Sequence, residues 1–429
     1  MLCRFKLHLF LVLALVVTAC GGGGTASTPQ QGSSGNQGKV TIRLSTWAGV
    51  DESKELQAII DKLNSKSNTY KIVHEPQPAD YYTKLQTTIS GGKGPDLMWL
   101  SQEYVPGYAE RGALMDLTQC VQEHSDKPAA KLDDYFESIL DVGKFEGKLY
   151  ALPWISQPVV LYYNPKLFKE AGVEEPNENW TWDDFKAAAA KLTNPKKGIY
   201  GTAFNGWPPI QMFIWQAGGD VISEDLKHSP IDSPEAIQAE KFYQEIVYNP
   251  KYAAPENIIA EQGFADLAKN GKVAMFFGGA ADDLDYAHAK DPKFAEMKAA
   301  LVPKGPKSRT TFAWTGLMAI NAKTANPEAA CQALLDLTDG IHHWKVLAPR
   351  KSLANKETII QAVPEKAKSA DVIIKAAQDM RTFRVVPQQS EWDTTFSEKF
   401  LDPLFHRKGT PEELAKKVRP ELEAILQGP

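Results

Sequence analysis

Hydrophobic and polar residues alternate from residue 40 onward, which predicts a strand, and the period then changes to that of a helix. The two patterns follow one another as far as residue 100. The expected elements are a strand over residues 40–44, a helix over 56–63, a strand over 70–74, a helix that Asp80 caps and Gly91 ends, and a strand over 97–100. Strands that alternate with helices in this way are typical of an α/β fold with a largely parallel sheet.

The same alternation restarts beyond Pro153. The expected elements are a strand over 159–163, a helix that begins at a Thr181–Asp184 capping box, a strand over 199–204, a helix opened by Ser233 and Pro234, a strand over 272–277 and a strand over 311–321. From residue 326 onward the pattern is almost wholly helical. Two successive α/β patterns indicate two packed halves.

The first 38 residues are not expected to belong to the folded body. Arg4 and Lys6 precede the apolar run 7–17, which is too short to cross a membrane and is typical of a signal peptide over residues 1–19. The residues Val17-Thr18-Ala19-Cys20 that follow resemble a bacterial lipobox. That resemblance implies cleavage before Cys20, lipidation of its sulfur, and a flexible tether over residues 20–38; ordinary secretory cleavage beside an incidental cysteine is the alternative.

The body from Lys39 onward is too long for a single compact core, so two domains are expected. The formal net charge of the whole chain is −5, and removal of Arg4 and Lys6 makes it more negative. This sign, with no basic run, argues against binding of nucleic acid. Two cysteines remain in the body, Cys120 and Cys331, and they can either form one disulfide or stay as buried thiols.

A series of short motifs runs through most of the body in a fixed order. They are Tyr82-Thr83-Lys84-Leu85, Gly91-Gly92, Gly94-Pro95-Asp96-Leu97, Gly147-Lys148-Leu149-Tyr150-Ala151-Leu152-Pro153-Trp154, Leu161-Tyr162-Tyr163-Asn164-Pro165, Leu167-Phe168, Ala171-Gly172, Thr181-Trp182-Asp183-Asp184-Phe185, Gly271-Lys272-Val273-Ala274-Met275, Gly278-Gly279 and Pro303-Lys304-Gly305. Together they resemble family 1 of the bacterial extracellular solute-binding proteins, the sugar-binding components of ABC importers.

The resemblance implies a two-lobe periplasmic-binding-protein-like fold of type II. Each lobe would be a mixed, mostly parallel sheet flanked by helices, and crossing strands would form a hinge. Lobe one would hold residues 39–156 and 309–370, and lobe two would hold residues 157–308 and 371–429. The implied function is capture of a mono- or oligosaccharide in the cleft between the lobes and its delivery to the permease of an ABC transporter. We expect a monomer outside the cytoplasm, anchored to the cell membrane by lipid.

Because such a protein only clamps its ligand, no catalytic residue, metal or cofactor is expected. A sugar has apolar faces that pack on aromatic rings and hydroxyl groups that need polar partners. Several of the ten tryptophans lie at the ends of predicted strands rather than on helix stripes. The tryptophans expected at the cleft are Trp47, Trp154, Trp207, Trp314 and Trp392, whereas Trp99, Trp180, Trp182 and Trp344 are expected to serve packing.

Four polar side chains complete the predicted ligand-binding set. Tyr82 and Glu103 match family positions that contact ligand, and Glu391 stands beside Trp392. Many family members have a tryptophan after the glycine pair 278–279; this chain has Ala280 there, so Asp282 is the replacement candidate. Asp393 also stands where the maltose-binding member has an aromatic residue, which makes maltodextrin a less suitable ligand than another saccharide.

Two other interpretations stay open. The same fold could bind a polyamine, which suits the acidic body, or a ferric ion through the tyrosine pairs 81–82 and 162–163. A secreted glycoside hydrolase that uses two carboxylates is the enzymatic alternative. The chain contains no HExxH, GxSxG, zinc-spaced cysteines or phosphate loop, so we expect a protein that is not an enzyme.

Overall fold

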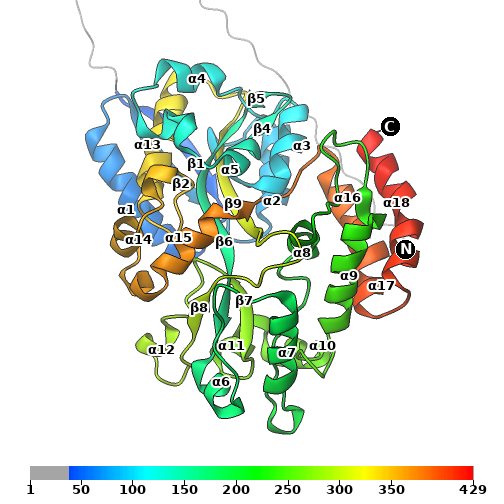
Figure 1. Cartoon of the computed structure of the whole chain (residues 1–429). Helices are drawn as coiled ribbons and strands as arrows, with labels where there is room; N and C mark the ends of the chain where they lie inside the picture. Colours follow the sequence, from blue (N-terminus) through cyan, green and yellow to red (C-terminus); the bar gives the residue numbers. More distant parts are fainter. Residues whose placement is uncertain (1–37, 429) are drawn as a thin grey trace, which may run out of the picture. The chain divides into compact units, whose positions relative to one another are not determined.

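The computed structural model describes residues 38–428. The predicted signal peptide, the lipidation site Cys20 and the tether up to residue 37 lie outside this range. Ten strands are found within it: β1 (Val40–Thr46), β2 (Tyr70–Pro76), β3 (Leu97–Ser101), β4 (Lys144–Phe145), β5 (Lys148–Leu149), β6 (Ala151–Tyr163), β7 (Met275–Gly279), β8 (Lys298–Ala300), β9 (Thr311–Ile320) and β10 (Met380–Arg381). Figure 1 shows how the helices surround them.

The same range contains eighteen α-helices. They are α1 (Val50–Lys66), α2 (Tyr81–Ser90), α3 (Val105–Glu110), α4 (Thr118–Glu123), α5 (Glu137–Asp141), α6 (Pro165–Ala171), α7 (Trp182–Leu192), α8 (Ile210–Ala217), α9 (Pro234–Ile246), α10 (Glu256–Gln262), α11 (Phe264–Lys269), α12 (Ala287–Lys290), α13 (Pro327–His342), α14 (Lys356–Ala362), α15 (Ala370–Gln378), α16 (Gln389–Phe396), α17 (Asp402–Phe405) and α18 (Pro411–Gln427). Within residues 38–428, none of them combines the length and the apolar character that a membrane crossing requires.

The main sheet has the strand order β2-β1-β3-β9-β6-β7, with β10 paired to β9 and β8 paired to β6. β1 pairs in parallel with β2 and β3, as the strand–helix–strand pattern predicts. β9 pairs antiparallel with β3 and β6 but in parallel with β10, and β7 and β8 pair antiparallel with β6. The predicted α/β architecture with a mixed sheet is confirmed, with its parallel strands concentrated around β1.

The segment 199–204, predicted as a strand, does not form one. Its backbone is bonded on both sides, because Tyr200 and Thr202 form isolated parallel bridges to Val273 and Ala253. Each bridge is only one residue long, so the segment is extended without joining a ladder. The second half of the chain therefore has fewer parallel strands than the sequence pattern predicts.

Two large groups of buried side chains fill the interior. One takes its members from residues 42–155 and 318–341, and the other from residues 159–312 and 392–425. β6 passes from the first group to the second between Ile155 and Val159, and β9 makes the same passage around Trp314, which packs against both. These two antiparallel strands are thus shared by both cores, while the predicted lobe boundaries remain a prediction.

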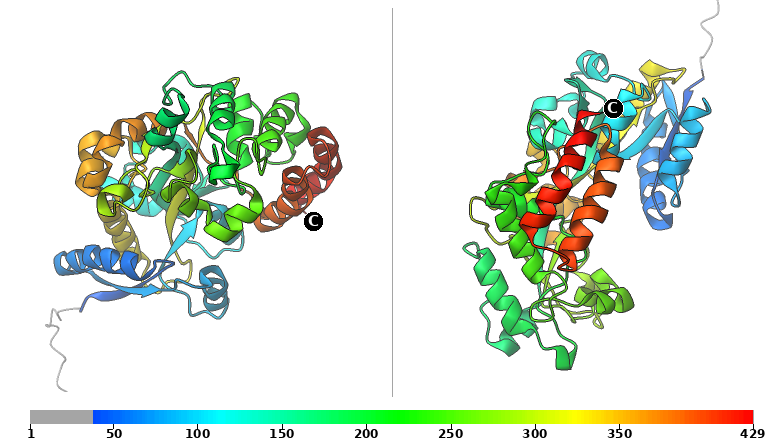
Figure 2. Two further views of the ribbon diagram at one scale, coloured as in Figure 1. Left: turned by 90° about the horizontal axis from the view of Figure 1, so that it is seen from below. Right: turned by 90° about the vertical axis from the view of Figure 1, so that its right-hand side faces the viewer.

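The C-terminal helices return to the second core. α16 and α18 lie side by side, and α18 also packs against α9, as the right-hand view of Figure 2 shows. Their buried residues, among them Trp392, Phe396 and Leu422, join the group that includes Phe213 and Tyr243. This return brings the beginning of α16 close to η1 (Gln102–Tyr104), the short helical turn that follows β3.

Cys120 on α4 and Cys331 on α13 form a disulfide, with their Cα atoms 5.9 Å apart. The sequence had left this pairing open against two buried thiols. The bond joins two helices of the first core that are 211 residues apart in the chain. Closing so long a loop restricts the unfolded chain, which stabilises the folded state.

Candidate ligand-binding site

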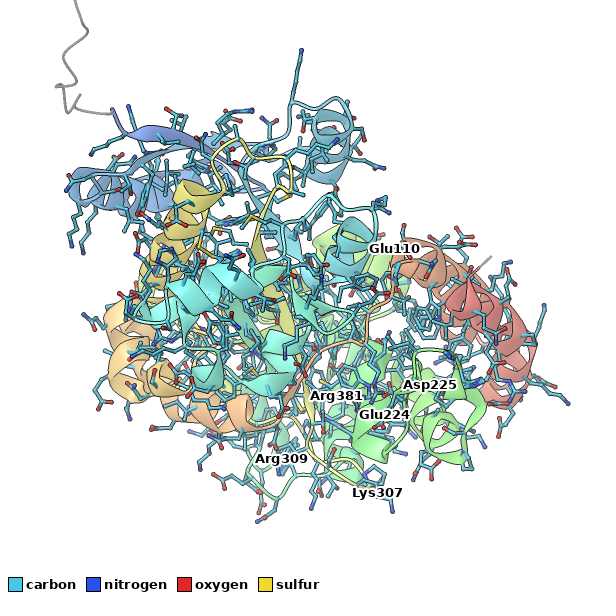
Figure 3. All side chains as sticks on the ribbon, turned by 90° about the horizontal axis from the view of Figure 1, so that it is seen from above. Glu110, Glu224, Asp225, Lys307, Arg309 and Arg381 are labelled. Carbon is cyan, nitrogen blue, oxygen red and sulfur yellow. A yellow bond between two sulfur atoms is a disulfide. The ribbon has the colours of Figure 1, made fainter. Side chains whose placement is uncertain are left out.

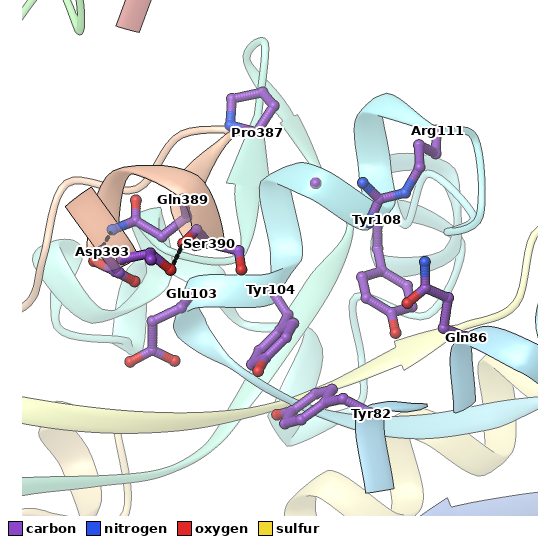
Figure 4. A pocket seen from close by; sticks show the side chains of 12 residues that line it. Tyr82, Gln86, Glu103, Tyr104, Tyr108, Arg111, Pro387, Gln389, Ser390 and Asp393 are labelled. Carbon is purple, nitrogen blue, oxygen red and sulfur yellow. Dashed lines mark hydrogen bonds between the residues drawn. The ribbon is translucent and has the colours of Figure 1, made fainter. Parts of the chain in front are cut away.

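A cavity of about 650 Å³ opens between the α2–α3 region and the beginning of α16 (Figure 4). α2, η1 and α3 form one side, and residue 387 with α16 forms the other. The lining residues are Tyr82, Gln86, Glu103, Tyr104, Gly107, Tyr108, Arg111, Pro387, Gln389, Ser390, Asp393 and Thr394. Since η1 directly follows the carboxyl end of β3, the cavity lies where open α/β sheets place their ligands.

Two tyrosine rings stack on one side of the cavity. The rings of Tyr82 and Tyr104 have centroids 3.5 Å apart and are almost parallel, at 10°. Tyr104 is 37% exposed, so one face of the stack is open to solvent. The hydroxyl of Tyr82 accepts a hydrogen bond of 2.8 Å from the backbone N–H of Ser101, which fixes the half-buried ring. The cavity therefore offers a rigid, flat aromatic surface.

A hydrogen-bond network ties the acidic side of the cavity to the crossing strand β9. The indole of Trp314 donates to the Ser101 hydroxyl at 3.1 Å, and that hydroxyl donates to the carboxylate of Glu103. Desolvation by the surrounding protein raises the pKa of Glu103, although its bond to Ser101 opposes the shift. Glu103 is thus held in place by a strand that both cores share.

The α16 side contributes a second carboxyl group and an amide. Gln389 donates its side-chain N–H to Asp393 at 2.8 Å, as the view in Figure 4 shows. Desolvation, with the negative charge of Glu103, raises the pKa of Asp393 to about 6, although the bond from Gln389 opposes the shift. A Cβ at Gly107 would lie 3.0 Å from the carbonyl oxygen of Pro387, so the two sides come close at one edge.

Three of the predicted tryptophans gather behind the tyrosine stack. The centroid of Trp47 lies 6.4 Å from Tyr82, 6.3 Å from Trp154 and 6.1 Å from Trp314. Trp47 and Trp314 are partly exposed, whereas Trp154 is only 3% exposed and stacks on Trp99. The structure therefore brings Trp47, Trp154 and Trp314 together with Tyr82, with Trp154 as the support beneath the aromatic surface.

Of the predicted residues, only Tyr82 and Glu103 line this cavity. Trp207 donates to the carbonyl of Phe277, and Asp282 accepts from the backbone N–H of Gly279. Trp392 is 1% exposed within the second core, and Glu391 is exposed on the outer face of α16. The next residue along that helix, Asp393, is the one that faces the cavity.

Several cavity residues were missed by the sequence analysis. Tyr104, Tyr108 and Arg111 follow the predicted strand 97–100, but only Glu103 matched a family position that contacts ligand. Gln389 comes from a helical region whose approach to η1 depends on the long return of the chain. Tyr104, Tyr108 and Arg111 could have been predicted from the sequence, because an acidic residue and two tyrosines follow a predicted strand there.

A second cavity, of about 360 Å³, lies beside Arg381 and Arg384. Both guanidinium groups contact the carboxylate of Asp220, and Arg384 also lies 3.4 Å from Glu224. Figure 3 shows Arg381 and Glu224 on the same side of the molecule. Because these charges already neutralise one another, the first cavity is the better candidate for a ligand.

Comparison with known proteins adds an independent line of evidence. The family model of the bacterial extracellular solute-binding proteins matches residues 48–335. This range contains η1, α2, α3 and both crossing strands, β6 and β9. It covers well over half of the chain.

Named relatives and solved structures extend the likeness to nearly the full length. The diacetylchitobiose-binding protein of Streptomyces coelicolor is 24% identical over 421 residues, which are 96% of this chain and 95% of that protein. An ABC substrate-binding protein of Listeria monocytogenes in complex with cycloalternan is 26% identical, with a TM-score of 0.76 over 90% of this chain and 98% of its own. A Mycobacterium tuberculosis protein in complex with glycerophosphocholine, 18% identical, has a TM-score of 0.74 over 91% and 99%.

Proposed function

We propose, from the premise that this chain belongs to the bacterial extracellular solute-binding protein family, that it captures a carbohydrate for an ABC importer. The two-lobe α/β fold of such binding proteins is confirmed by the structural likeness. Of the proteins compared, the one from Streptomyces coelicolor is named for diacetylchitobiose, and the one from Listeria monocytogenes is in complex with cycloalternan. The glycerophosphocholine complex, at its low identity, informs on the fold alone.

The observation that carries the proposal is the chemistry of the cavity. The stack of Tyr82 and Tyr104 presents an aromatic face, and Glu103, Gln389 and Asp393 present hydrogen-bonding groups around it. A sugar ring needs this combination, because its C–H faces are apolar while its hydroxyl groups must not be buried without partners. The volume of about 650 Å³ is that of a small-molecule site.

We further infer that the protein works by closure of two lobes around the ligand. The α16 side of the cavity packs into the second core. The α2–α3 side packs in a smaller group with Leu100 of β3 and Leu317 of β9, and β6 and β9 connect the two main cores. A ligand that contacts both sides binds the closed form better, and this difference in affinity drives closure. Trp47 and Trp314 would enlarge the aromatic surface, with Trp207 and Asp282 as ligand contacts on the second lobe.

The N-terminal segment completes the proposed working arrangement. Lipidation of Cys20 would hold the protein at the outer side of the cell membrane, and the glycine-rich tether would let the body reach the permease. The protein would act as a monomer. A shift of the intact mass by a diacylglyceryl group after expression in bacteria tests the anchor.

The ferric alternative has less support from the tyrosine pairs. The hydroxyl of Tyr81 donates to the carbonyl oxygens of Ser45 and Trp99, and that of Tyr162 donates to the carbonyl of Gly279. These hydroxyl groups are engaged in packing within the protein. The family is one of binding proteins, and release of reducing ends from oligosaccharides would be the sign of a hydrolase.

A thermal-shift screen against mono- and oligosaccharides tests the proposal. Binding to the native state alone raises the melting temperature by mass action, so at least one sugar is expected to raise it. Tyr104→Ala removes the open face of the stack and is expected to weaken that binding about tenfold, or ~1.4 kcal/mol. Tyr248→Ala, a partly exposed tyrosine that packs against Phe405 and lies outside the cavity, is the matched control and should bind normally. A flat response to every sugar, with a shift by spermidine or ferric citrate, would contradict the proposal.

A further inference from the structure

Two carboxylates face the proposed sugar site without a basic partner. Glu103 is bonded to the hydroxyl of Ser101, and Asp393 to the amide of Gln389. Both partners are neutral. Within residues 38–428, no Lys, Arg or His lies within ion-pair distance of either carboxylate, although 31 such contacts occur elsewhere. Two uncompensated acidic groups at one cavity are therefore a specific feature of this site.

Two other enclosed carboxylates among residues 38–428 have basic partners. Asp285, whose side chain is 4% exposed, lies 2.7 Å from the fully buried ammonium group of Lys366. Asp220, at 16%, contacts both Arg381 and Arg384. Burial of a charge without such a partner is costly, so an enclosed pair of like charges indicates a missing counter-charge.

The basic residue that lines the cavity is directed elsewhere. Arg111 places its guanidinium group 5.4 Å from the ring centroid of Tyr108, and it has no hydrogen bond to either carboxylate. Figure 4 shows Arg111 and Tyr108 on one side and Glu103 with Asp393 on the other. The acidic end of the cavity thus has no basic partner, while the opposite end carries the guanidinium group of Arg111.

We propose that the cavity is built for a sugar that carries a protonated amine, with the ammonium group between Glu103 and Asp393 and the ring on Tyr104. This inference rests on the proposed function and narrows its ligand class to amino sugars. The stacked rings of Tyr82 and Tyr104 favour the same ligand, because a cation near an aromatic face is attracted to it.

An ammonium group suits this site better than a hydroxyl group does. It supplies three hydrogen-bond donors and one positive charge, so it can donate to the carboxylates and offset one of their two negative charges. A hydroxyl group supplies one donor and leaves both negative charges in place. When the cavity closes over a neutral sugar, the repulsion between the two carboxylates strengthens as water leaves.

The test is isothermal titration calorimetry of the purified protein at pH 7.5 with sugars that differ at one substituent. Glucosamine, galactosamine, mannosamine and the β-1,4-linked glucosamine disaccharide are each compared with the parent bearing a hydroxyl and with the N-acetylated form. The amine is expected to bind at least tenfold more tightly than both neutral counterparts in at least one series. Equal or tighter binding of the neutral forms in every series would overturn the inference.

Two variants test whether Glu103 and Asp393 cause the preference for an amino sugar over a neutral one. Glu103→Gln and Asp393→Asn keep the shape and remove one charge each, so each is expected to reduce the amine preference by fivefold or more while the neutral parent still binds. Glu110→Gln is the control, because Glu110 is an exposed acid at the end of α3 that does not line the cavity. An unchanged preference in both cavity variants would contradict the assignment.

The outcomes separate this inference from the proposed function. If neutral sugars bind and no amine is preferred, the inference fails and carbohydrate capture stands. If spermidine binds and no sugar of any kind does, both fail. Binding of spermidine together with a preferred amino sugar supports the carboxylate pair as the source of selectivity.

Discussion

A carboxyl group buried on α9 shows how strongly enclosure acts on a single residue. Glu240 is fully buried, and neither of its carboxyl oxygens has a hydrogen-bond partner among the described residues. Desolvation, with a smaller contribution from the nearby charges of Glu412 and Asp232, raises its pKa to about 9. At neutral pH the native protein therefore holds Glu240 as the neutral acid.

The consequence is a stability that falls as pH rises. The unfolded chain releases the proton near the ordinary pKa of a glutamic acid, whereas the native chain keeps it up to about pH 9. Above the ordinary pKa the unfolded state binds fewer protons, so raising the pH favours unfolding. The contribution of this residue is fully present at the ordinary pKa and below, and is lost by about pH 9.

Glu240→Met should remove this dependence. The thioether fills a similar volume without a group that must stay protonated, so we expect the variant to be about 2–4 kcal/mol more stable than the parent at pH 8 and nearly equal at pH 5. Urea denaturation at the two pH values measures the difference. Glu261→Met, at an exposed position of α10, is the control and should show no such dependence. An equal effect of Glu240→Met at both pH values would contradict the assigned protonation state.

The cavity shows which of its residues could be predicted from the sequence and which could not. Tyr82 and Glu103 were predicted as ligand contacts and line the cavity, because both stand close to the carboxyl edge of β1 and β3. Trp392 and Glu391 were chosen on α16, yet the cavity is lined by Asp393. One step along a helix turns the side chain by about 100°, which moves it between the core and the cavity. Sequence alone does not fix that rotation.

At the scale of elements, two helix starts show that a residue of the capping type does not always make a capping hydrogen bond. Thr181 accepts a hydrogen bond from the backbone N–H of Asp184, and Asp184 accepts one from Thr181 in return. This is the predicted capping box of α7. Asp80 stands at the predicted start of α2, but its backbone is left-handed, with φ at 53°, and its side chain makes no capping bond. The expectation that Asp80 caps α2 was wrong in that respect.

The two positions should therefore respond differently to substitution. Thr181→Ala removes a capping bond and is expected to lower the free energy of unfolding by ~1 kcal/mol. Asp80→Asn keeps a residue that tolerates the left-handed region and removes no capping bond, so a change of less than ~0.5 kcal/mol is expected. Chemical denaturation at pH 7 measures both. An unchanged stability of Thr181→Ala would contradict the capping bond assigned to α7.

Most of the strands predicted from the hydrophobic pattern are present in the structure. β1, β2, β3, β6 and β9 all lie where a strand was predicted, although β6 extends eight residues further toward the N-terminus than expected. That extension carries Pro153, and its pairing to β9 contains an irregularity between Pro153 and Ile155. Pairing of this kind depends on a strand that lies far along the chain, since Pro153 pairs with Leu317, and no local pattern encodes it.

At the scale of the whole molecule, the sequence predicted two halves and the structure shows two main cores joined by shared strands. The prediction of two halves rested on the length of the chain and on the restart of the α/β pattern. The position of the cavity depends on more than that pattern, since the C-terminal helices return to the second core and bring α16 opposite η1. Only the folded chain establishes that proximity.

The central claim is that a sugar binds in the cavity between η1 and α16. The crystal structure of the protein with the carbohydrate that raises its melting temperature most tests this claim directly. We predict electron density for the sugar with its ring against Tyr104 and its polar groups within hydrogen-bond distance of Glu103 and Asp393. A sugar found only elsewhere, for example in the cavity beside Arg381, with the η1–α16 cavity filled by water alone, would contradict it.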